Sequence, residues 1–125
     1  MKIECGTDII EISRIKESIQ EAGERFLNRV YTKAEIEYCE SKKQQKYQHY
    51  AARFAAKEAV FKVISCLLDD KYSICWKDIE VVNDSQGKPK VNLLGIDEKR
   101  IENISLSMSH CKEYAVANAV AILEY

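Results

Sequence analysis

Apolar residues recur at three- and four-residue spacing through the middle of the chain, which is the pattern of one buried helix face. A second stripe of residues lies beside that face. The face comprises Ala52, Ala55, Ala56, Ala59, Val60, Val63, Ile64 and Leu67, and the stripe comprises Ala51, Phe54, Glu58 and Phe61. The pattern predicts a long central helix whose most buried part holds one carboxylate, Glu58, between two aromatic rings.

Local signals place further elements in the first third of the chain. Residues 1–12 are rich in β-branched side chains and predict a strand, in which Gly6 lets another segment approach the backbone closely. Ser13 is the expected N-cap of a following helix, and Gly23 is its expected end. The central helix should begin near Lys33, because capping-box spacing and a flanking apolar pair come together there. The capping-box residues are Thr32 and Glu35, and the apolar pair is Tyr31 and Ile36.

Period-two alternation dominates the second half and predicts strands. Residues 76–83 and 90–94 flank a loop through Asp84 and Gly87, which is typical of a hairpin. Two more strands are expected near 104–109 and 115–122, where apolar residues alternate with serines and with alanines. With no linker or repeat visible, the chain is expected to form one α+β domain spanning residues 1–125.

Composition narrows the class of protein. The hydrophobic fraction of 46% is ordinary for a globular domain, and the net charge of -1 gives no reason to expect nucleic acid as a partner. The five cysteines are odd in number and show no metal-binding spacing, which favours reduced thiols and a cytoplasmic location. No leader segment and no apolar run long enough for a bilayer is visible, so no membrane association is expected.

Two sheltered carboxylates are the first candidates for chemistry. A buried ionised carboxylate must be neutralised, paired or bound to a cation, and Lys62 is the first candidate partner of Glu58, one helical turn away. Asp8 follows Gly6 among apolar neighbours near a strand end. Taken alone, the pattern favours an ordinary helical ion pair for Glu58 and Lys62, and a turn or cap residue for Asp8.

Four motifs, in their order and spacing, resemble one known family across nearly the whole length. They are Gly6–Glu11, Arg53–Ala59 with Lys62, Asn83–Pro89 and Ser107–His110. The chain resembles the holo-acyl-carrier-protein synthases, the small 4′-phosphopantetheinyl transferases. The resemblance implies their α+β fold, with a long central helix packed on a mainly antiparallel sheet. It also implies transfer of the 4′-phosphopantetheine group from coenzyme A to a serine of an apo acyl carrier protein, assisted by magnesium.

The same resemblance implies roles for individual residues. Asp8 and Glu58 would bind Mg²⁺, and Lys62 would contact the pyrophosphate, so these three form the catalytic set. The nucleotide end of coenzyme A would be held by Arg53, Lys88, Pro89 and His110 together with Lys62. The nucleotide-binding candidates have structural alternatives. The alternative for Arg53 is a solvated charge on a helix, for Lys88-Pro89 after a glycine an ordinary turn, and for His110 a histidine between strands whose hydrogen bonds are satisfied within the fold.

Departures from the family pattern affect the end of the central helix. Relatives carry a glycine-rich turn there, whereas residues 65–70 of this chain contain no glycine, so the helix is expected to run further. Ala52, Thr7 and Cys111 also replace residues that are usual in the family. The altered turn keeps open the same chemistry on a polyketide or peptidyl carrier, and a coenzyme A- or carrier-binding module without activity is a third possibility.

Basic residues gather in the first helical region, at Arg14, Lys16, Arg25, Arg29 and Lys33. A solvated mixed-charge face and a docking surface explain this pattern equally well. The carrier proteins that this family modifies are acidic, so the resemblance favours a docking surface, with Arg14 and Arg25 as the leading contacts. The resemblance also implies a homotrimer with its sites at subunit boundaries, since larger family members resemble two fused modules of this size.

Overall fold

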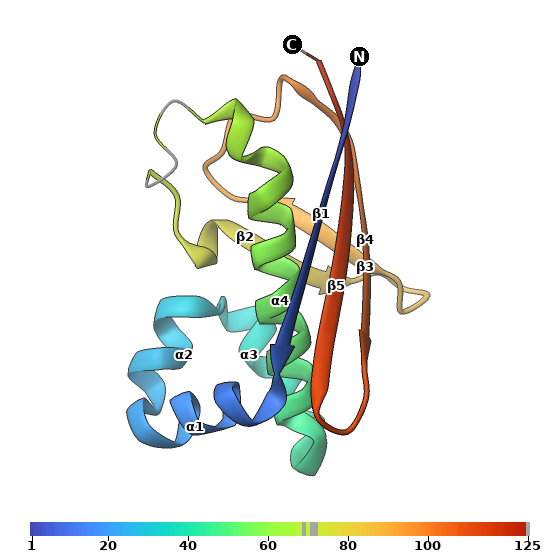
Figure 1. Ribbon diagram of the computed structural model, residues 1–125. Coiled ribbons are helices and arrows are strands. Elements are labelled where there is room, and N and C mark those ends of the chain that lie inside the picture. Colours follow the sequence, from blue (N-terminus) through green and yellow to red (C-terminus); the bar gives the residue numbers. More distant parts are fainter. Residues whose placement is uncertain (69, 71–72, 125) are drawn as a thin grey trace.

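A long helix lies against two antiparallel sheets and three shorter helices in the computed structural model, which describes residues 1–68, 70 and 73–124 (Figure 1). The helices are α1 (Ile12–Ala22), α2 (Glu24–Val30), α3 (Lys33–Glu40) and α4 (Lys46–Ile64), with 3₁₀ helices at Lys43–Gln45, Ser65–Leu67 and Trp76–Asp78. The strands are β1 (Lys2–Glu11), β2 (Ile79–Asn83), β3 (Pro89–Leu93), β4 (Ile101–His110) and β5 (Tyr114–Leu123). The predicted α+β class, with a central helix on antiparallel sheet, is confirmed.

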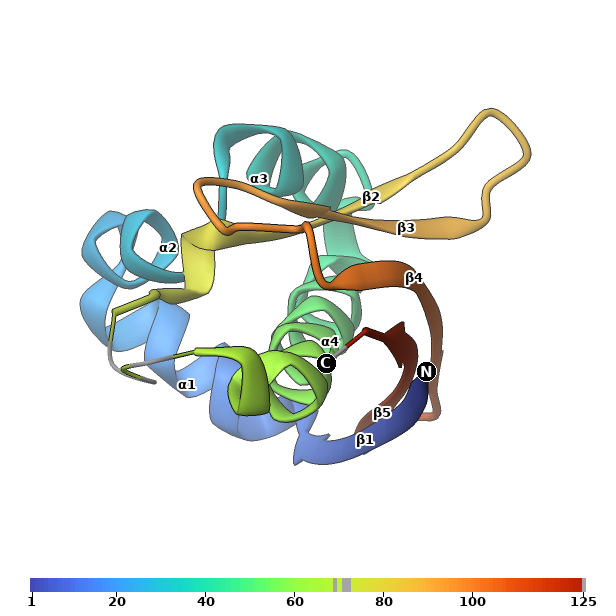
Figure 2. The same cartoon turned by 90° about the horizontal axis from the view of Figure 1, so that it is seen from above.

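The larger sheet has the strand order β1-β5-β4, and both pairings are antiparallel. Asp8 lies opposite Ala117 of β5, which in turn lies opposite Met108 of β4. The smaller sheet is the predicted hairpin, with Ile79 opposite Leu93 and Asn83 opposite Pro89. Its first strand starts at Ile79 rather than at the predicted Trp76, because Trp76–Asp78 form a 3₁₀ helix. Seen from above, α4 is central, with the larger sheet curving round one side of it and the hairpin crossing another (Figure 2).

Small residues let α4 and the larger sheet approach closely. The alanines of β5 face α4 and are buried, whereas the β-branched residues between them lie on the outer face. A Cβ added to Gly6 of β1 would lie 2.5 Å from the carbonyl oxygen of Ala59, so only glycine fits there. This confirms the predicted close approach, and it places the crossing of β1 and α4 at Gly6 and Ala59.

Helix boundaries follow the predicted caps in two places and differ in others. The Thr32–Glu35 capping box is present and starts α3 at Lys33, and Gly23 ends α1 with φ 56°. The prediction that the central helix itself begins there is wrong, because α3 ends at Glu40 and α4 starts only at Lys46. The prediction of Ser13 as an N-cap is wrong, because the strand ends at Glu11 and passes directly into α1 without a side-chain cap.

After the central helix the chain continues for one turn as a 3₁₀ helix, Ser65–Leu67, and then leaves the helical path at Leu68. The expected longer run is therefore a single tighter turn, and Asp69, part of the altered turn, lies outside the described residues. No helix within the described residues is long and apolar enough to cross a membrane.

Candidate active site

Asp8 and Lys62 meet where β1 crosses α4. The Lys62 ammonium donates to the backbone carbonyl of Thr7 at 2.7 Å and lies 3.5 Å from Oδ1 of Asp8. The lysine side chain is 51% exposed and the aspartate side chain 21%, so the pair opens to solvent from the lysine side. Gly6 makes this contact possible, because a bulkier residue there would push β1 away from α4.

Glu58 has a different partner from the one expected. Its Oε1 accepts a hydrogen bond of 2.6 Å from the indole Nε1 of Trp76, and within the described residues Lys62 forms its ion pair with Asp8. The carboxylate is partly buried rather than at the most buried point of α4, although its neighbour Ala59 is fully buried. The predicted Glu58–Lys62 ion pair is therefore wrong. Lys62 instead pairs with Asp8, one helical turn beyond Glu58.

A cavity of about 400 Å³ lies beside Glu58. Its lining is mainly apolar and comes from α4 and from the segment that leads into β2. The lining residues are Lys57, Glu58, Phe61, Ile74, Cys75, Trp76 and Ile79. Glu58 thus places a charged group at the wall of an apolar cavity, next to one of the two aromatic rings that the sequence predicted.

A buried ion pair lies beneath this cavity. Lys57 and Glu35 have no exposed side-chain surface, and their Nζ and Oε1 atoms are 2.7 Å apart. The ammonium also donates to the carbonyls of Trp76 at 3.0 Å and Ile79 at 2.7 Å, so each of its three protons has an acceptor. Burial lowers the pKa of Lys57, while the opposing carboxylate acts in the other direction.

Glu35 connects that ion pair to β2. Its Oε2 accepts from the backbone N–H of Val81 at 2.8 Å, while Oε1 also closes the capping box with Thr32 at 2.8 Å. The residue that the sequence identified only as a helix cap therefore ties α3, α4 and β2 together. Local spacing could not reveal this second role, because its partners lie 22 and 46 residues further along the chain.

Arg53 and His110 belong to a second group, at the β2 side of α4. The Arg53 guanidinium lies 4.0 Å from the Tyr38 ring centroid and donates to Oδ1 of Asn83 at 2.6 Å. Only 2% of Arg53 is exposed, so its alternative assignment as a solvated helix charge is wrong. Its Nε has no hydrogen-bond partner among the residues that the structure describes.

His49 joins Tyr38 to His110 in this group. The His49 ring centroid lies 5.7 Å from that of Tyr38 and 5.7 Å from that of His110, both in edge-on contact. Burial, and then the nearby His110, lower the pKa of His49, so this environment favours a neutral imidazole. Lys42 adds a cation 4.8 Å from the Tyr38 ring. Sequence spacing contains no signal that brings Tyr38, His49 and Asn83 into this group, because they come from separate elements.

Lys88 and Pro89 lie at the end of the hairpin turn, beside a groove of about 620 Å³ between β3 and β4. The turn is held by Asp84, whose Oδ1 accepts from the backbone N–H groups of Gln86 and Lys88, each at 2.9 Å. These two hydrogen bonds lower the pKa of Asp84. Asn83 donates to the Gly87 carbonyl at 2.9 Å and so links this turn to Arg53. The turn is therefore connected to the Arg53 group through one side chain rather than by direct contact within the described residues.

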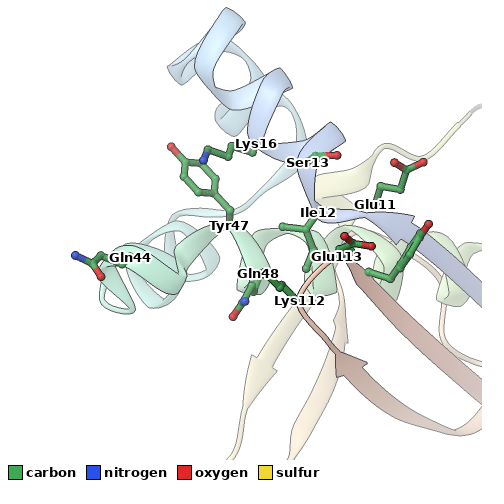
Figure 3. Close-up of a pocket in the computed structure, with 10 residues that line it drawn as sticks. Glu11, Ile12, Ser13, Lys16, Gln44, Tyr47, Gln48, Lys112 and Glu113 are labelled. Atoms are coloured by element: carbon green, nitrogen blue, oxygen red, sulfur yellow. The ribbon is translucent and has the colours of Figure 1, made fainter.

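The two predicted docking residues are exposed on the N-terminal helices, Arg14 on α1 and Arg25 on α2. Beside α1 lies a hollow of about 480 Å³, which also involves α4 and the turn between β4 and β5 (Figure 3). Lys16 projects into it over the Tyr47 ring, with 5.5 Å between the ammonium and the centroid. Arg29, by contrast, turns toward Trp76 at 5.8 Å from the ring centroid and leaves the predicted basic cluster.

The two groups of candidate residues occupy opposite edges of the larger sheet. Asp8 is on β1 and His110 is on β4, with β5 between these strands. Two strand spacings amount to roughly 10 Å, and α4 packs across the sheet between the groups. The structure thus brings Asp8 and Lys62 together, links Arg53 to His110 through Tyr38 and His49, and places Glu58 against Trp76.

Known proteins resemble this chain over nearly its whole length. The family model of the 4′-phosphopantetheinyl transferase superfamily matches residues 4–119. A holo-[acyl-carrier-protein] synthase of Ruminiclostridium cellulolyticum is 48% identical over 128 residues, covering 98% of this chain and 94% of that protein. The corresponding protein of Dehalococcoides mccartyi is 46% identical over 121 residues, covering 93% of this chain and 95% of its own.

Solved structures of similar proteins share the fold. A holo-(acyl-carrier-protein) synthase from Bacillus anthracis, in complex with CoA (3′,5′-ADP), superposes with a TM-score of 0.76 at 34% identity, covering 97% of this chain and 96% of that one. The Helicobacter pylori synthase in complex with coenzyme A gives a TM-score of 0.81 at 27% identity, covering 95% of this chain and 100% of that one.

Proposed function

The chain belongs to the 4′-phosphopantetheinyl transferase superfamily, and we propose that it is a holo-[acyl-carrier-protein] synthase. In this reaction the hydroxyl oxygen of a carrier serine forms a bond to the phosphorus that bears the pantetheine. The pyrophosphate P–O bond breaks, the serine proton is released and adenosine 3′,5′-bisphosphate leaves. The observation that carries the proposal is the ion pair of Asp8 with Lys62 where β1 crosses α4, with Glu58 one helical turn before Lys62.

Asp8 and Glu58 fit a magnesium ion. They offer hard oxygen ligands at two partly exposed positions, and the described residues contain no group of three or more His, Cys, Asp or Glu placed to hold a metal ion. Magnesium commonly takes one or two protein carboxylates and completes its coordination with water and substrate phosphate, so this donor set suits it. When bound, it would offset negative charge on the pyrophosphate oxygens.

Lys62 is suited to the pyrophosphate. Its contact with Asp8 is long at 3.5 Å and half of its side chain is exposed, so the ammonium can turn toward a phosphate without losing a tight ion pair. Its charge then stabilises the negative charge that develops on the leaving phosphate. We expect Lys62→Ala to lower kcat more than it raises the KM for coenzyme A.

The nucleotide end of coenzyme A would lie at the second group, against His110 and the turn that carries Lys88 and Pro89. Arg53 is buried against Tyr38 and holds Asn83, so its contribution combines positive charge with support of that turn. Positive charge from Lys42 would favour a phosphate there.

A homotrimer with shared sites would explain why these two groups lie at opposite sheet edges. A neighbouring chain in a head-to-tail arrangement would bring its second group to the first group of this chain, and cyclic symmetry closes such an arrangement. The outer face of the sheet supports an interface, because it exposes 65% of Ile3, 64% of Ile9 and 42% of Val120. Thr7 and Asn118 are hydrogen-bonded at 2.5 Å within that face.

Mixing inactive chains tests the shared site. Glu58→Ala chains and His110→Ala chains should each be inactive or strongly impaired, and mixed trimers should regain activity at boundaries that combine one intact group from each chain. Exchange of subunits is verified by native mass spectrometry of differently tagged chains. Exchange without recovered activity, or an active monomer in sedimentation, contradicts the shared-site proposal.

Carrier docking is proposed at the α1–α2 surface that exposes Arg14 and Arg25. Charge reversal at either residue should slow association with an acidic carrier and weaken its salt dependence, while coenzyme A binding stays unchanged. Reversal of an exposed lysine elsewhere, Lys99→Glu, is the matched control. Equal association rates across a salt series for Arg14→Glu, Arg25→Glu and wild type would exclude this surface.

We place the enzyme in the cytoplasm and its product in fatty-acid biosynthesis. Three of the five cysteines, Cys5, Cys75 and Cys111, are exposed free thiols, which suits a reducing compartment. The proposed transferase domain spans residues 1–125, of which the family model matches 4–119.

Two isosteric variants test the cation ligands. Asp8→Asn and Glu58→Gln remove charge with little change in shape, and each should abolish magnesium-dependent transfer while leaving the protein folded. Glu21→Gln, an exposed position on α1, is the control. Near-normal activity in either ligand variant would refute the assignment of that residue.

A further inference from the structure

Trp76 contacts the catalytic group although no family motif of the sequence includes it. It is the only tryptophan of the chain, and it precedes β2 in a 3₁₀ helix, Trp76–Asp78. Its indole N–H donates to Oε1 of Glu58 at 2.6 Å, a short hydrogen bond to a charged acceptor. This bond joins a candidate metal ligand to a segment 18 residues further along the chain.

The indole is itself held by contacts on several sides. Its ring lies 5.8 Å from that of Phe54 at 34°, and the Arg29 guanidinium lies 5.8 Å from its centroid. Its backbone carbonyl accepts from the buried Lys57 ammonium at 3.0 Å. The position of the indole N–H is therefore set by contacts that do not depend on Glu58.

Glu58 is in the opposite situation. It is partly exposed at the wall of the 400 Å³ cavity, and a glutamate has three rotatable side-chain bonds. Within the described residues, the hydrogen bond that it accepts from Trp76 is made through Oε1, which leaves Oε2 to take a ligand. The hydrogen bond already restricts rotation of this carboxylate, so binding of a cation costs less side-chain conformational entropy.

We propose that Trp76 is a positioning residue for the transferase reaction, whose indole N–H orients Glu58 for a divalent cation. This inference rests on the proposed function of Glu58 as a magnesium ligand. Partners that orient metal ligands typically change metal affinity or activity by about 10- to 100-fold when they are removed. We therefore expect Trp76→Phe to raise the KM for Mg²⁺ by about 10- to 100-fold while the KM for coenzyme A changes less than about threefold.

Two replacements separate the N–H from the ring. Trp76→Phe keeps an aromatic ring against Phe54 and Arg29 but has no donor. Because the chain has one tryptophan, biosynthetic replacement of tryptophan by β-(3-benzothienyl)alanine exchanges only the N–H for sulfur and serves if Trp76→Phe folds poorly. Phe61→Leu is the control, since it removes a different ring from the same cavity and retains the donor and the contacts that hold it, and it should leave the KM for Mg²⁺ within about threefold of wild type.

Fluorescence provides a readout that does not depend on turnover. Emission from the single tryptophan of the wild-type protein should change on titration with MgCl₂, because a cation on Glu58 withdraws charge from the acceptor of the indole hydrogen bond. Glu58→Gln should abolish that change, and an equivalent concentration of NaCl should not produce it.

Three results overturn the inference: an unchanged KM for Mg²⁺ in both N–H-deficient proteins, an equal rise in the KM values for Mg²⁺ and coenzyme A, or a fluorescence response that survives in Glu58→Gln. Failure of the proposed function is recognised separately, as absence of transfer by the wild-type protein.

Discussion

Lys57→Met should strongly destabilise the fold, because it removes the cation from a fully buried ion pair. The Lys57 ammonium has three acceptors, at 2.7 Å on Glu35, 2.7 Å on Ile79 and 3.0 Å on Trp76, and neither charged side chain is exposed. Methionine fills nearly the same space, so little cavity is created. The loss comes from the carboxylate and the two carbonyls that remain buried with fewer partners.

Removal of one partner from a buried pair costs about 3–5 kcal/mol of the free energy of unfolding. With a urea m-value of about 2 kcal/mol per M, a loss of about 4 kcal/mol lowers the unfolding midpoint by roughly 2 M. Urea unfolding followed by circular dichroism measures this shift. The measurement is repeated at several protein concentrations, because assembly would make the midpoint depend on concentration.

Lys62→Met is the matched control on the same helix. Its ion pair with Asp8 is half exposed on the lysine side and 3.5 Å long, so its loss should change stability by less than about 1 kcal/mol. The double variant Glu35→Gln/Lys57→Met removes both charges and should recover part of the stability lost in Lys57→Met. Equal midpoints for Lys57→Met and Lys62→Met, or no recovery in the double variant, would refute this reasoning.

Three further predictions concern packing, thiol reactivity and pH. Gly6→Ala should destabilise the protein by about 1–3 kcal/mol in urea unfolding, because its Cβ would lie 2.5 Å from the Ala59 carbonyl oxygen; an unchanged midpoint would contradict the tight crossing. Cys39 should resist iodoacetamide in the folded protein, since burial raises its pKa to about 12, whereas Cys111, whose pKa is lowered by backbone hydrogen bonds, should react readily; equal labelling rates by peptide mass spectrometry would refute this. The pKa of His49 is lowered on folding, so the unfolded chain binds a proton more readily and stability falls as pH drops through the usual histidine pKa of about 6.5. His49→Phe should lose less stability than wild type between about pH 7 and 5, and identical pH slopes in the two proteins would contradict that assignment.

Local sequence signals predicted the elements that local physics determines. The capping box at Thr32 marked the start of α3, and period-two alternation located β4 and β5. Gly6 was correctly interpreted as a point of close approach, because a glycine inside a strand commonly marks a bulge or a place where another backbone comes near. Asp8 and Lys62 do lie together, although the sequence pattern had paired Lys62 with Glu58.

The remaining features depend on contacts between residues far apart in the chain. Glu58 and Trp76 are separated by 18 residues, Glu35 and Val81 by 46, and Asp8 and Lys62 by 54. A helical i,i+4 spacing favours an ion pair, but it cannot exclude a better partner from a strand that crosses the helix. For the same reason the sequence could not distinguish an exposed Arg53 from one buried against Tyr38 and Asn83.

Intact-protein mass spectrometry of a carrier protein tests the proposed transferase activity most directly. The purified protein is incubated with coenzyme A, MgCl₂ and an apo acyl carrier protein, with an apo peptidyl carrier and a Ser→Ala acyl carrier in parallel. We predict one added 4′-phosphopantetheine on the serine of the acyl carrier, release of adenosine 3′,5′-bisphosphate in equal amount, and no addition to the Ser→Ala carrier. No mass gain on any carrier by the folded wild-type protein with magnesium present would contradict the assignment as a holo-[acyl-carrier-protein] synthase.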